Sequence, residues 1–555
     1  MYNLTKLLLL FQTYFVKKVF PIKSLKSIAI IGGGIAGSTI ALRLAHLGLN
    51  VHLFEKNNSL VSGPPMCHLH AGGNMYRELS DEDCRTLLRQ GIDTVHLYPH
   101  SIDARPTLIA VPCRDDGHPE TLLPRLKMLK DYYQQLIAEN PKNAIFDEYY
   151  HVYERADLDR LKTLSTVKTP ISADDWMINF VHVTDLDQLK YPVILVNEYS
   201  WNIFQLSASV SSYLLLLNTV HLHFQSKVQH IQQQSDKTWQ ISYQQTNHDV
   251  VDNLTLNVDF MINAAGFLTG QIDDQANVKI ERMVEFKAAY LSRWDKCDDA
   301  NHILALPEMV FHGERGTPTG MAQFTPYAGG YVQLHGMSNE ITLFDDGLHH
   351  STAESNQPYV NPTYVNYINQ GWDENVPAKR TQRAIEFLTV FIPEFSNAKP
   401  YHRALFGAQQ VPDDDIAVRV GSVEIDANKN YATVQNVKAS SALDIADKIA
   451  KHLYDLAWIE SDARPHQWYD LDKNQVTALA KQTAEQRGYD KVLAEIDFPL
   501  NITQTHNVSL SLDDSQPIDY QANATTMQAI ADFRQGRVKQ YKNINALRDK
   551  LNKKH

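Results

Sequence analysis

The sequence predicts an α/β fold built around a parallel sheet, and three observations support this prediction. A short apolar run, Ser27 to Ile31, is typical of a strand buried on both faces. A glycine-rich turn and a helical pattern come next, and Val51 to Phe54 has the pattern of a second strand. Val258 to Gly266 is a further strand pattern that ends in small residues. Strands that alternate with helices in this way pair in parallel.

Composition narrows the class of protein. The chain has 555 residues, 43% of them hydrophobic, and a net charge of −12. This excludes collagen-like, disordered and disulfide-scaffold proteins, and the acidic balance argues against nucleic-acid binding. Four cysteines without CxxC spacing indicate a reducing compartment, so we predict a cytoplasmic protein. No apolar run reaches the length of about 18 residues that a membrane span needs.

The glycine-rich turn has the spacing Gly32-x-Gly34-x-x-Gly37, and each glycine has a physical reason. Gly32 permits the tight turn, Gly34 lets backbone N–H groups approach a pyrophosphate, and Gly37 lets the helix pack close to the strand. The phosphates would then lie at the helix N-terminus, which favours anions. Glu55 ends the second strand, where its carboxylate is placed to accept hydrogen bonds from ribose hydroxyls. The pattern predicts a Rossmann-like dinucleotide-binding domain.

Three later segments favour FAD over NAD as the dinucleotide. They are a helical run from Phe204 to Leu217 with strand patterns after it, the segment Ile262-Asn-Ala-Ala-Gly266, and the polar segment Cys67 to Asn74 with His70-Ala-Gly-Gly73. With the fingerprint, these motifs resemble the FAD-dependent oxidoreductases of the D-amino-acid-oxidase-like (DAO) family. The resemblance implies FAD as cofactor and the following contact residues: Gly32, Gly34, Gly37, Glu55 and Lys56 with the ADP half, and Val228, Ala265 and Gly266 along the cofactor.

The resemblance also implies a domain organisation. We expect a glutathione-reductase-type, Rossmann-like FAD-binding domain that is interleaved with an α+β substrate domain. The expected ranges are 27–80, 195–270 and 400–455 for the FAD-binding domain, 81–194 and 271–399 for the substrate domain and insertions, 456–555 for a C-terminal helical appendage, and 1–26 for a basic and apolar extension.

The segment that closes the flavin site departs from the family pattern. Family members have a glycine-rich turn before the last helix, whereas this chain has Val434 to Ala442. Small residues there, Ser440 among them, can still offer N–H groups to the flavin N1–C2 region from a helix N-terminus. Lys438 would add positive charge beside a reduced flavin. The alternative is a surface lysine next to an ordinary capped helix.

No second GxGxxG follows a strand after residue 60, which favours hydride delivery from the substrate itself rather than from NAD(P)H. Substrates of similar enzymes are usually small amines or hydroxy acids with a carboxylate or phosphate, and such groups need a cationic clamp. Arg77 and Arg403 flank cofactor segments and are the best candidates for this clamp. Arg282 and Lys287, which follow the Asn-Ala-Ala-Gly segment, are weaker ones.

Histidines are the natural candidates for the base that takes the substrate proton. His68 and His70 lie in the glycine-containing segment, and His335 is a third candidate. The alternative for each is a packed or surface histidine, and the resemblance adds covalent attachment of FAD through a histidine of that segment. No third ligand with suitable spacing accompanies His68 and His70, so we predict no metal site.

We therefore predict an oxidase or dehydrogenase that oxidises a small amino or hydroxy acid and passes electrons to oxygen or another acceptor. One alternative is a membrane-associated, quinone-reducing dehydrogenase whose basic termini contact anionic lipid at the inner face of a membrane. Another is a flavin-binding redox sensor or assembly factor without turnover. Residues 501–521 have the composition of a linker, and 525–552 that of a basic amphipathic helix. Specificity depends on a pocket built from distant segments, so the sequence does not name the substrate.

Overall fold

The computed structural model describes residues 26–63, 66–68, 79–146, 148–247, 250–295, 305–372, 375–412, 420–435, 438–465, 468 and 470–500. All of them belong to one folding unit, which spans residues 1–502. The predicted linker at 501–521, the predicted helix at 525–552 and the N-terminal extension except Lys26 lie outside the described residues. Within the described part, no helix is long and apolar enough to cross a membrane.

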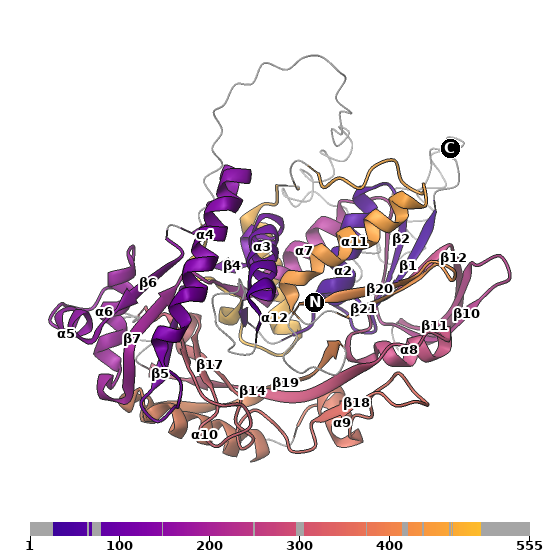
Figure 1. Cartoon of the computed structure of the whole chain (residues 1–555). Helices are drawn as coiled ribbons and strands as arrows, with labels where there is room; N and C mark the ends of the chain where they lie inside the picture. Colours follow the sequence, from indigo (N-terminus) through magenta and orange to yellow (C-terminus); the bar gives the residue numbers. More distant parts are fainter. Residues whose placement is uncertain are drawn as a thin grey trace, which may run out of the picture. The chain divides into compact units, whose positions relative to one another are not determined.

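The predicted parallel sheet is present and has the strand order β20-β21-β13-β1-β2-β9 among the described residues. Its strands β20, β21, β1 and β2 are labelled in Figure 1. Strand β1 pairs in parallel with β2 and β13, so that Ile30 lies opposite Leu53 on one side and Ile262 on the other. Only the edge strand β20 pairs antiparallel with its neighbour in this sheet of described strands. The strands are β1 Ser27–Ile31, β2 Asn50–Phe54, β9 Val220–His223, β13 Phe260–Asn263, β20 Ser422–Asp426 and β21 Tyr431–Gln435.

Alternate residues of β1 contribute to two different cores, as the period of a strand requires. Ile28 and Ile30 join a cluster with residues of three helices, whereas Ala29 and Ile31 join a second cluster with residues of a three-stranded antiparallel sheet and one further helix. The parallel sheet therefore lies between these two layers. The helices are α2 Ile35–His46, α7 Ile203–Leu215 and α11 Ala442–Asp455 on the first face, and α8 Thr269–Ala276 with β10 Ser226–Gln233, β11 Trp239–Asn247 and β12 Val250–Val258 on the second.

A second large sheet has nine strands within the described residues, and Figure 1 shows its long strands β14 and β19 side by side. One face packs against α6 and α10 through an apolar cluster that includes Phe180, Ile385 and Phe391. The strands are β5 Thr107–Pro112, β6 Tyr150–Tyr153, β7 Leu189–Val196, β14 Arg282–Arg293, β15 Glu308–Phe311, β16 Ala322–Pro326, β17 Tyr331–Gly336, β18 Leu348–His350 and β19 Lys399–Pro412; the helices are α5 Arg155–Leu161, α6 Ala173–Val183, α9 Pro362–Gln370 and α10 Asn375–Thr389.

Two helices, α3 Asp81–Leu97 and α4 Leu123–Glu139, come between the strands of the two large sheets in the chain. Ser80 begins α3 because its hydroxyl accepts a hydrogen bond from the Asp83 N–H at 3.0 Å, which satisfies one N–H group of the first turn. Among the described residues, a small separate sheet has β8 between β3 and β4. Its strands are β3 Met66–His68, β4 Ile102–Asp103 and β8 Ser200–Asn202.

Residues 471–500, the C-terminal segment, are packed more closely than the expected appendage implies. The segment contains α12 (Lys473–Gln486) and the 3-10 turn η10 (Lys491–Ala494). The buried apolar side chains of α12 and η10 belong to the same cluster as those of α2, α7 and α11. The Asn202 amide donates hydrogen bonds to the carbonyl oxygens of Leu493 and Glu495 at 2.8 and 3.1 Å. The division of the chain into domains stays a prediction.

Candidate functional site

The glycine-rich turn joins β1 to α2 at close range. Gly32 has φ +106°, and its N–H donates to the Phe54 carbonyl oxygen at 2.9 Å. A Cβ atom on Gly32 would lie 2.3 Å from the carbonyl oxygen of Ala264, and one on Gly37 would lie 2.0 Å from that of Gly32. Neither position has room for a side chain. These two glycines are therefore required by the packing of β1, β13 and α2.

Gly34 differs from its two partners because a Cβ atom there would meet no described atom within 4 Å. The residue has an extended backbone (φ −65°, ψ 179°) and directly precedes α2. Within the described part of the chain, no side chain caps the first turn of this helix. Open space beside uncapped N–H groups at a helix N-terminus suits a phosphate group. The turn thus fits the pyrophosphate of a dinucleotide.

Glu55 folds back on the turn. One oxygen of its carboxylate accepts a hydrogen bond from the Gly33 N–H at 2.9 Å, and the other accepts from the backbone and side chain of Asn57, both at 2.8 Å. The oxygen that accepts from Gly33 keeps a second lone pair for another donor, whereas the oxygen that accepts from Asn57 already has two donors. The hydrogen bonds from this carboxylate to ribose therefore stay a prediction that the geometry permits. Lys56, its neighbour, is exposed.

The Asn-Ala-Ala-Gly segment ends β13, and its asparagine stabilises the turn after that strand. The Asn263 amide donates to the Thr269 carbonyl oxygen and to Asp273, each at 2.8 Å. Gly266 has φ +63° and open space where a Cβ atom would lie. The nearby Ala265 and Val228, the second from β10, are partly buried at the edge of one hydrophobic cluster. Ala264 and Ala265 lie beside Gly32 of the glycine-rich turn. The cofactor contacts of Val228, Ala265 and Gly266 stay predictions.

Arg282 was a weaker candidate for the substrate clamp, and the structure gives it a different role. Its guanidinium is fully buried in an ion pair with Asp273 and donates to the Thr269 hydroxyl at 2.7 Å. The Asp273 carboxylate also accepts hydrogen bonds from Tyr431 at 2.6 Å and Thr433 at 2.5 Å. A cation held in this way stabilises the fold beneath the Asn-Ala-Ala-Gly turn. We therefore remove Arg282 from the clamp.

The segment before α11 contains a buried hydroxyl that has no partner among the described residues. Ser440 is 1% exposed and lies in the 3-10 turn η9 (Ala439–Ser441), which Lys438 precedes. The Ser440 carbonyl oxygen accepts from the Thr94 hydroxyl at 3.2 Å, which fixes the backbone there. Buried polar atoms are normally hydrogen-bonded, so an unpaired Oγ indicates space for a ligand atom. The flavin contact at Ser440 stays a prediction.

One face of the nine-stranded sheet is polar although it is largely buried. Along β15, β16 and β17 the residues alternate, with apolar side chains in the cluster beneath the helices α6 and α10. Ala289, Tyr331 and Leu405, which belong to the other face, pack into the cluster that contains α2 and α11. The polar face therefore lies toward the parallel sheet. Its polar residues on these three strands are Glu308, Gln323, Thr325, Gln333 and His335.

Positive charge collects at one end of this face. Arg315 and Lys287 both pair with the Glu285 carboxylate, Lys287 at 3.5 Å. Burial lowers the pKa of His335 to about 3, and the charges of Lys287, Lys438 and Arg315 contribute to this lowering. The imidazole is therefore neutral at physiological pH, and its Nδ1 atom is buried without a partner among the described residues. The combined positive potential favours an anionic ligand.

The residues predicted to do the chemistry are only partly described. His70 and Arg77 lie outside the described residues, as do the side chains of His68 and Arg403. The backbone of His68 lies in β3 opposite Ser200, and that of Arg403 lies in β19. The Ser200 hydroxyl donates to the buried Glu308 at 2.8 Å, so β3 runs beside the polar face. The clamp and base roles of the four residues stay predictions.

Glu308 and Arg315 were missed by the sequence analysis. Glu308 begins a strand whose polar and apolar residues alternate, and this alternation could have placed it on a polar face. Arg315 lies between β15 and β16 in a stretch without periodicity, so no local pattern marks it. Within the described residues, no group of three or more His, Cys, Asp or Glu side chains is placed to hold a metal ion.

Comparisons with known proteins bear on this geometry. The family model described as FAD dependent oxidoreductase (DAO) matches residues 27–139. No curated protein matches the chain. The dithionite-reduced L-α-glycerophosphate oxidase from Mycoplasma pneumoniae with FAD bound is similar in structure, with 15% identity, 81% of this chain and 99% of that chain covered, and a TM-score of 0.50. Glycine oxidase from Geobacillus kaustophilus has 11% identity, coverage of 80% and 100%, and a TM-score of 0.46.

The family match begins at β1 and includes the glycine-rich turn and Glu55, the same residues that the sequence motifs single out. The similarity to the glycerophosphate oxidase shows a shared fold, which has a Rossmann-like parallel sheet here. Residues 27–139 of this chain thus match the DAO family of FAD-dependent oxidoreductases.

Proposed function

We propose that this enzyme oxidises a small amino or hydroxy acid by hydride transfer to flavin. The observation that carries the proposal is the cationic end of the buried polar face, formed by Lys287, Arg315 and Lys438 around His335. FAD, when bound, supplies the hydride acceptor. The chain supplies a positive field that holds an acidic substrate, and walls that keep water from the reacting carbon.

The cofactor contacts are part of this proposal. The pyrophosphate would lie on the turn around Gly34, at the N-terminus of α2, and the adenosine ribose beside Glu55. The flavin end would lie near Ser440, whose hydroxyl is buried before α11 and has no partner among the described residues. The remaining proposed contacts are Gly32, Gly37, Lys56, Val228, Ala265, Gly266 and Lys438.

The residues of the polar face would have two roles, binding of the substrate carboxylate and acceptance of a hydrogen bond from its amine or hydroxyl. Arg315 presents a planar guanidinium, and Lys287 presents a point charge; together they would hold a substrate carboxylate that competes with Glu285. His335 is neutral and can accept a hydrogen bond from a substrate amine or hydroxyl. Arg77 and Arg403 remain proposed additional clamps, and His68 and His70 remain proposed bases.

A panel of small amino and hydroxy acids tests the proposal directly. Each compound is added anaerobically to the purified, FAD-loaded chain, and the loss of flavin absorbance is recorded. We expect at least one acid to reduce the flavin, and the matching amine or alcohol without a carboxylate to fail. If no compound reduces the flavin, a flavin-binding protein without turnover is the better description. Rates with oxygen and with a quinone dye then identify the electron acceptor.

Variants of the cationic group localise the substrate. Arg315→Gln and Lys287→Gln should each raise KM for the active acid about tenfold, because a charge-assisted hydrogen bond to the carboxylate is lost. Lys162→Gln, which changes an exposed lysine on another part of the surface, is the matched control and should leave KM unchanged. Unchanged KM in both of the first two variants would place the substrate acid elsewhere.

A further inference from the structure

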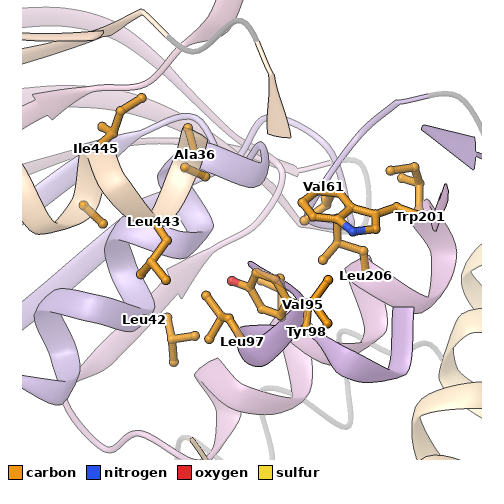
Figure 2. Packing of buried hydrophobic residues seen from close by; sticks show 14 of the residues in the cluster. Ala36, Leu42, Val61, Val95, Leu97, Tyr98, Trp201, Leu206, Leu443 and Ile445 are labelled. Carbon is orange, nitrogen blue, oxygen red and sulfur yellow. The ribbon is translucent and has the colours of Figure 1, made fainter. Parts of the chain in front are cut away.

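Val61 has a backbone conformation that is unusual for its residue type. Its φ is +54°, in the left-handed region, which is unfavourable for a β-branched side chain. The side chain is 2% exposed and packs in the same hydrophobic cluster as Trp201 and Leu206 (Figure 2). The Val61 N–H donates to the carbonyl oxygen of Gly33 at 2.9 Å. A strained residue thus supports the glycine-rich turn directly.

Arg487, the residue that follows α12, holds the strained loop. Its guanidinium donates to the carbonyl oxygens of Val61 at 3.0 Å and Leu60 at 2.6 Å, and to the Ser59 hydroxyl at 3.1 and 3.2 Å. The Ser207 hydroxyl of α7 donates to the same Leu60 carbonyl oxygen at 2.7 Å. Burial lowers the pKa of Arg487 to about 10, which leaves it charged at neutral pH. Two consecutive backbone carbonyl groups are thereby fixed by one side chain.

The loop in turn fixes two parts of the cofactor turn. A Cβ atom on Gly33 would lie 2.7 Å from Leu60 Cδ2 and 2.9 Å from Glu55 Cβ, so the loop and the turn are in close contact. Gly33 also donates its N–H to Glu55. If Leu60 and Val61 moved, Gly33 would lose its contacts with the loop. The open space beside Gly34 would then lose its shape.

We propose that Arg487 is a positioning residue for FAD, which it serves by holding residues 59–61 in the conformation that supports Gly33. The inference rests on the proposed placement of FAD on this turn. Without the guanidinium, Val61 would relax toward the extended region, because the hydrogen bond that offsets its backbone strain is lost, and its N–H would leave Gly33. The C-terminal segment is therefore required for tight cofactor binding, although it lies far from the fingerprint in sequence.

FAD titration of the full-length apoprotein, followed by flavin fluorescence quenching, tests the inference. Arg487→Leu should raise the Kd for FAD about tenfold or more, as the loss of charge-assisted hydrogen bonds implies. Arg105→Leu is the matched control, because Arg105 is also buried and binds Asp497 of the C-terminal segment at 3.2 Å. It should lower the melting temperature similarly and leave the Kd unchanged. If Arg487→Leu does not fold, Arg487→Lys serves the same comparison.

A second substitution separates positioning from general stability. Val61→Gly in the Arg487→Leu background should recover most of the FAD affinity, because glycine adopts positive φ without strain. An unchanged Kd in Arg487→Leu would overturn the inference, as would an equal loss of affinity in Arg105→Leu or no recovery by Val61→Gly. A wild-type chain that binds FAD but reduces it with no acid would count only against the proposed function. If Gly34→Ala binds FAD with the same Kd as the wild-type chain, the proposed placement of FAD is wrong, and this inference is wrong with it.

Discussion

The glycines of the turn should separate experimentally into one that serves the cofactor and others that serve the fold. Gly34→Ala adds a Cβ atom to open space, at a φ of −65° that alanine adopts freely. Gly37→Ala adds one that would lie 2.0 Å from the carbonyl oxygen of Gly32, a backbone atom that cannot turn aside. We expect the first variant to lose FAD affinity with a stable fold, and the second to lose stability.

The magnitudes can be worked out from these contacts. In the apoprotein, Gly34→Ala should change the free energy of unfolding by less than about 1 kcal/mol, in the stabilising direction, since alanine restricts the unfolded chain. The new methyl group would occupy the space proposed for the pyrophosphate. Losing one charge-assisted hydrogen bond of about 1.5–3 kcal/mol raises Kd by roughly ten- to a hundredfold. Gly37→Ala should cost about 1–3 kcal/mol by overpacking, minus up to about 1 kcal/mol for the better helix former.

Two assays on the same preparations distinguish these effects. Urea denaturation of the apoprotein gives the unfolding free energy, and titration with FAD gives Kd. Wild-type affinity in Gly34→Ala would refute the placement of the pyrophosphate on this turn. A large loss of apoprotein stability in the same variant would show that the space beside Gly34 is filled, and would refute the distinction between the glycines.

Three further predictions concern stability. Burial and neighbouring histidines lower the pKa of His52 to about 3 and that of His223 to about 4, so below pH 6.5 these histidines bind protons in the unfolded chain but not in the folded one. The free energy of unfolding should therefore fall by about 2 kcal/mol per histidine from pH 7 to pH 4.5. The urea midpoint of His223→Gln should depend less on pH than that of the wild type. Arg282→Leu should cost about 3–5 kcal/mol in urea denaturation, because Asp273 is left buried without its cation, and Asp273→Asn in addition should recover part. Asn202→Ala should make the C-terminal segment cleave faster in limited proteolysis, with wild-type cleavage rates contradicting its role there.

The parallel sheet could be predicted because its signals are local. Ser27 to Ile31 is apolar at every position after the first, which is typical of a strand with both faces covered, and the glycine spacing predicts the turn and the helix after it. Helix α3 has similarly local signals, since Ser80 and three acidic residues mark its start. Where an element of the fold is determined by its own segment, the sequence pattern predicts it.

Roles that depend on distant contacts could not be predicted. Arg487 follows a polar helix whose buried stripe, Val476, Ala480 and Ala484, is narrow and made of small residues, so its packing against the core was not expected. Arg282 has the same residue type and position after a strand as a substrate clamp would have. Only the burial of Asp273 beside it decides against that role. No sequence pattern links Arg487 to residues 60 and 61, or Arg282 to Asp273.

The polar face of the nine-stranded sheet is the observation on which the proposed substrate site rests. Each buried polar side chain there costs desolvation free energy of about 1–3 kcal/mol unless it is paired, and an apolar face would pack equally well. Glu308 and His335 therefore occupy positions that stability alone would give to leucine or valine. A surface groove between α3 and α4 is also polar, but its arginines are paired with acids at the surface, as Arg89 is with Glu139 at 2.8 Å. The Nδ1 atom of His335, by contrast, is buried beside Lys287, Lys438 and Arg315 and has no partner among the described residues. On this ground we propose that the substrate lies at the sheet rather than in the groove.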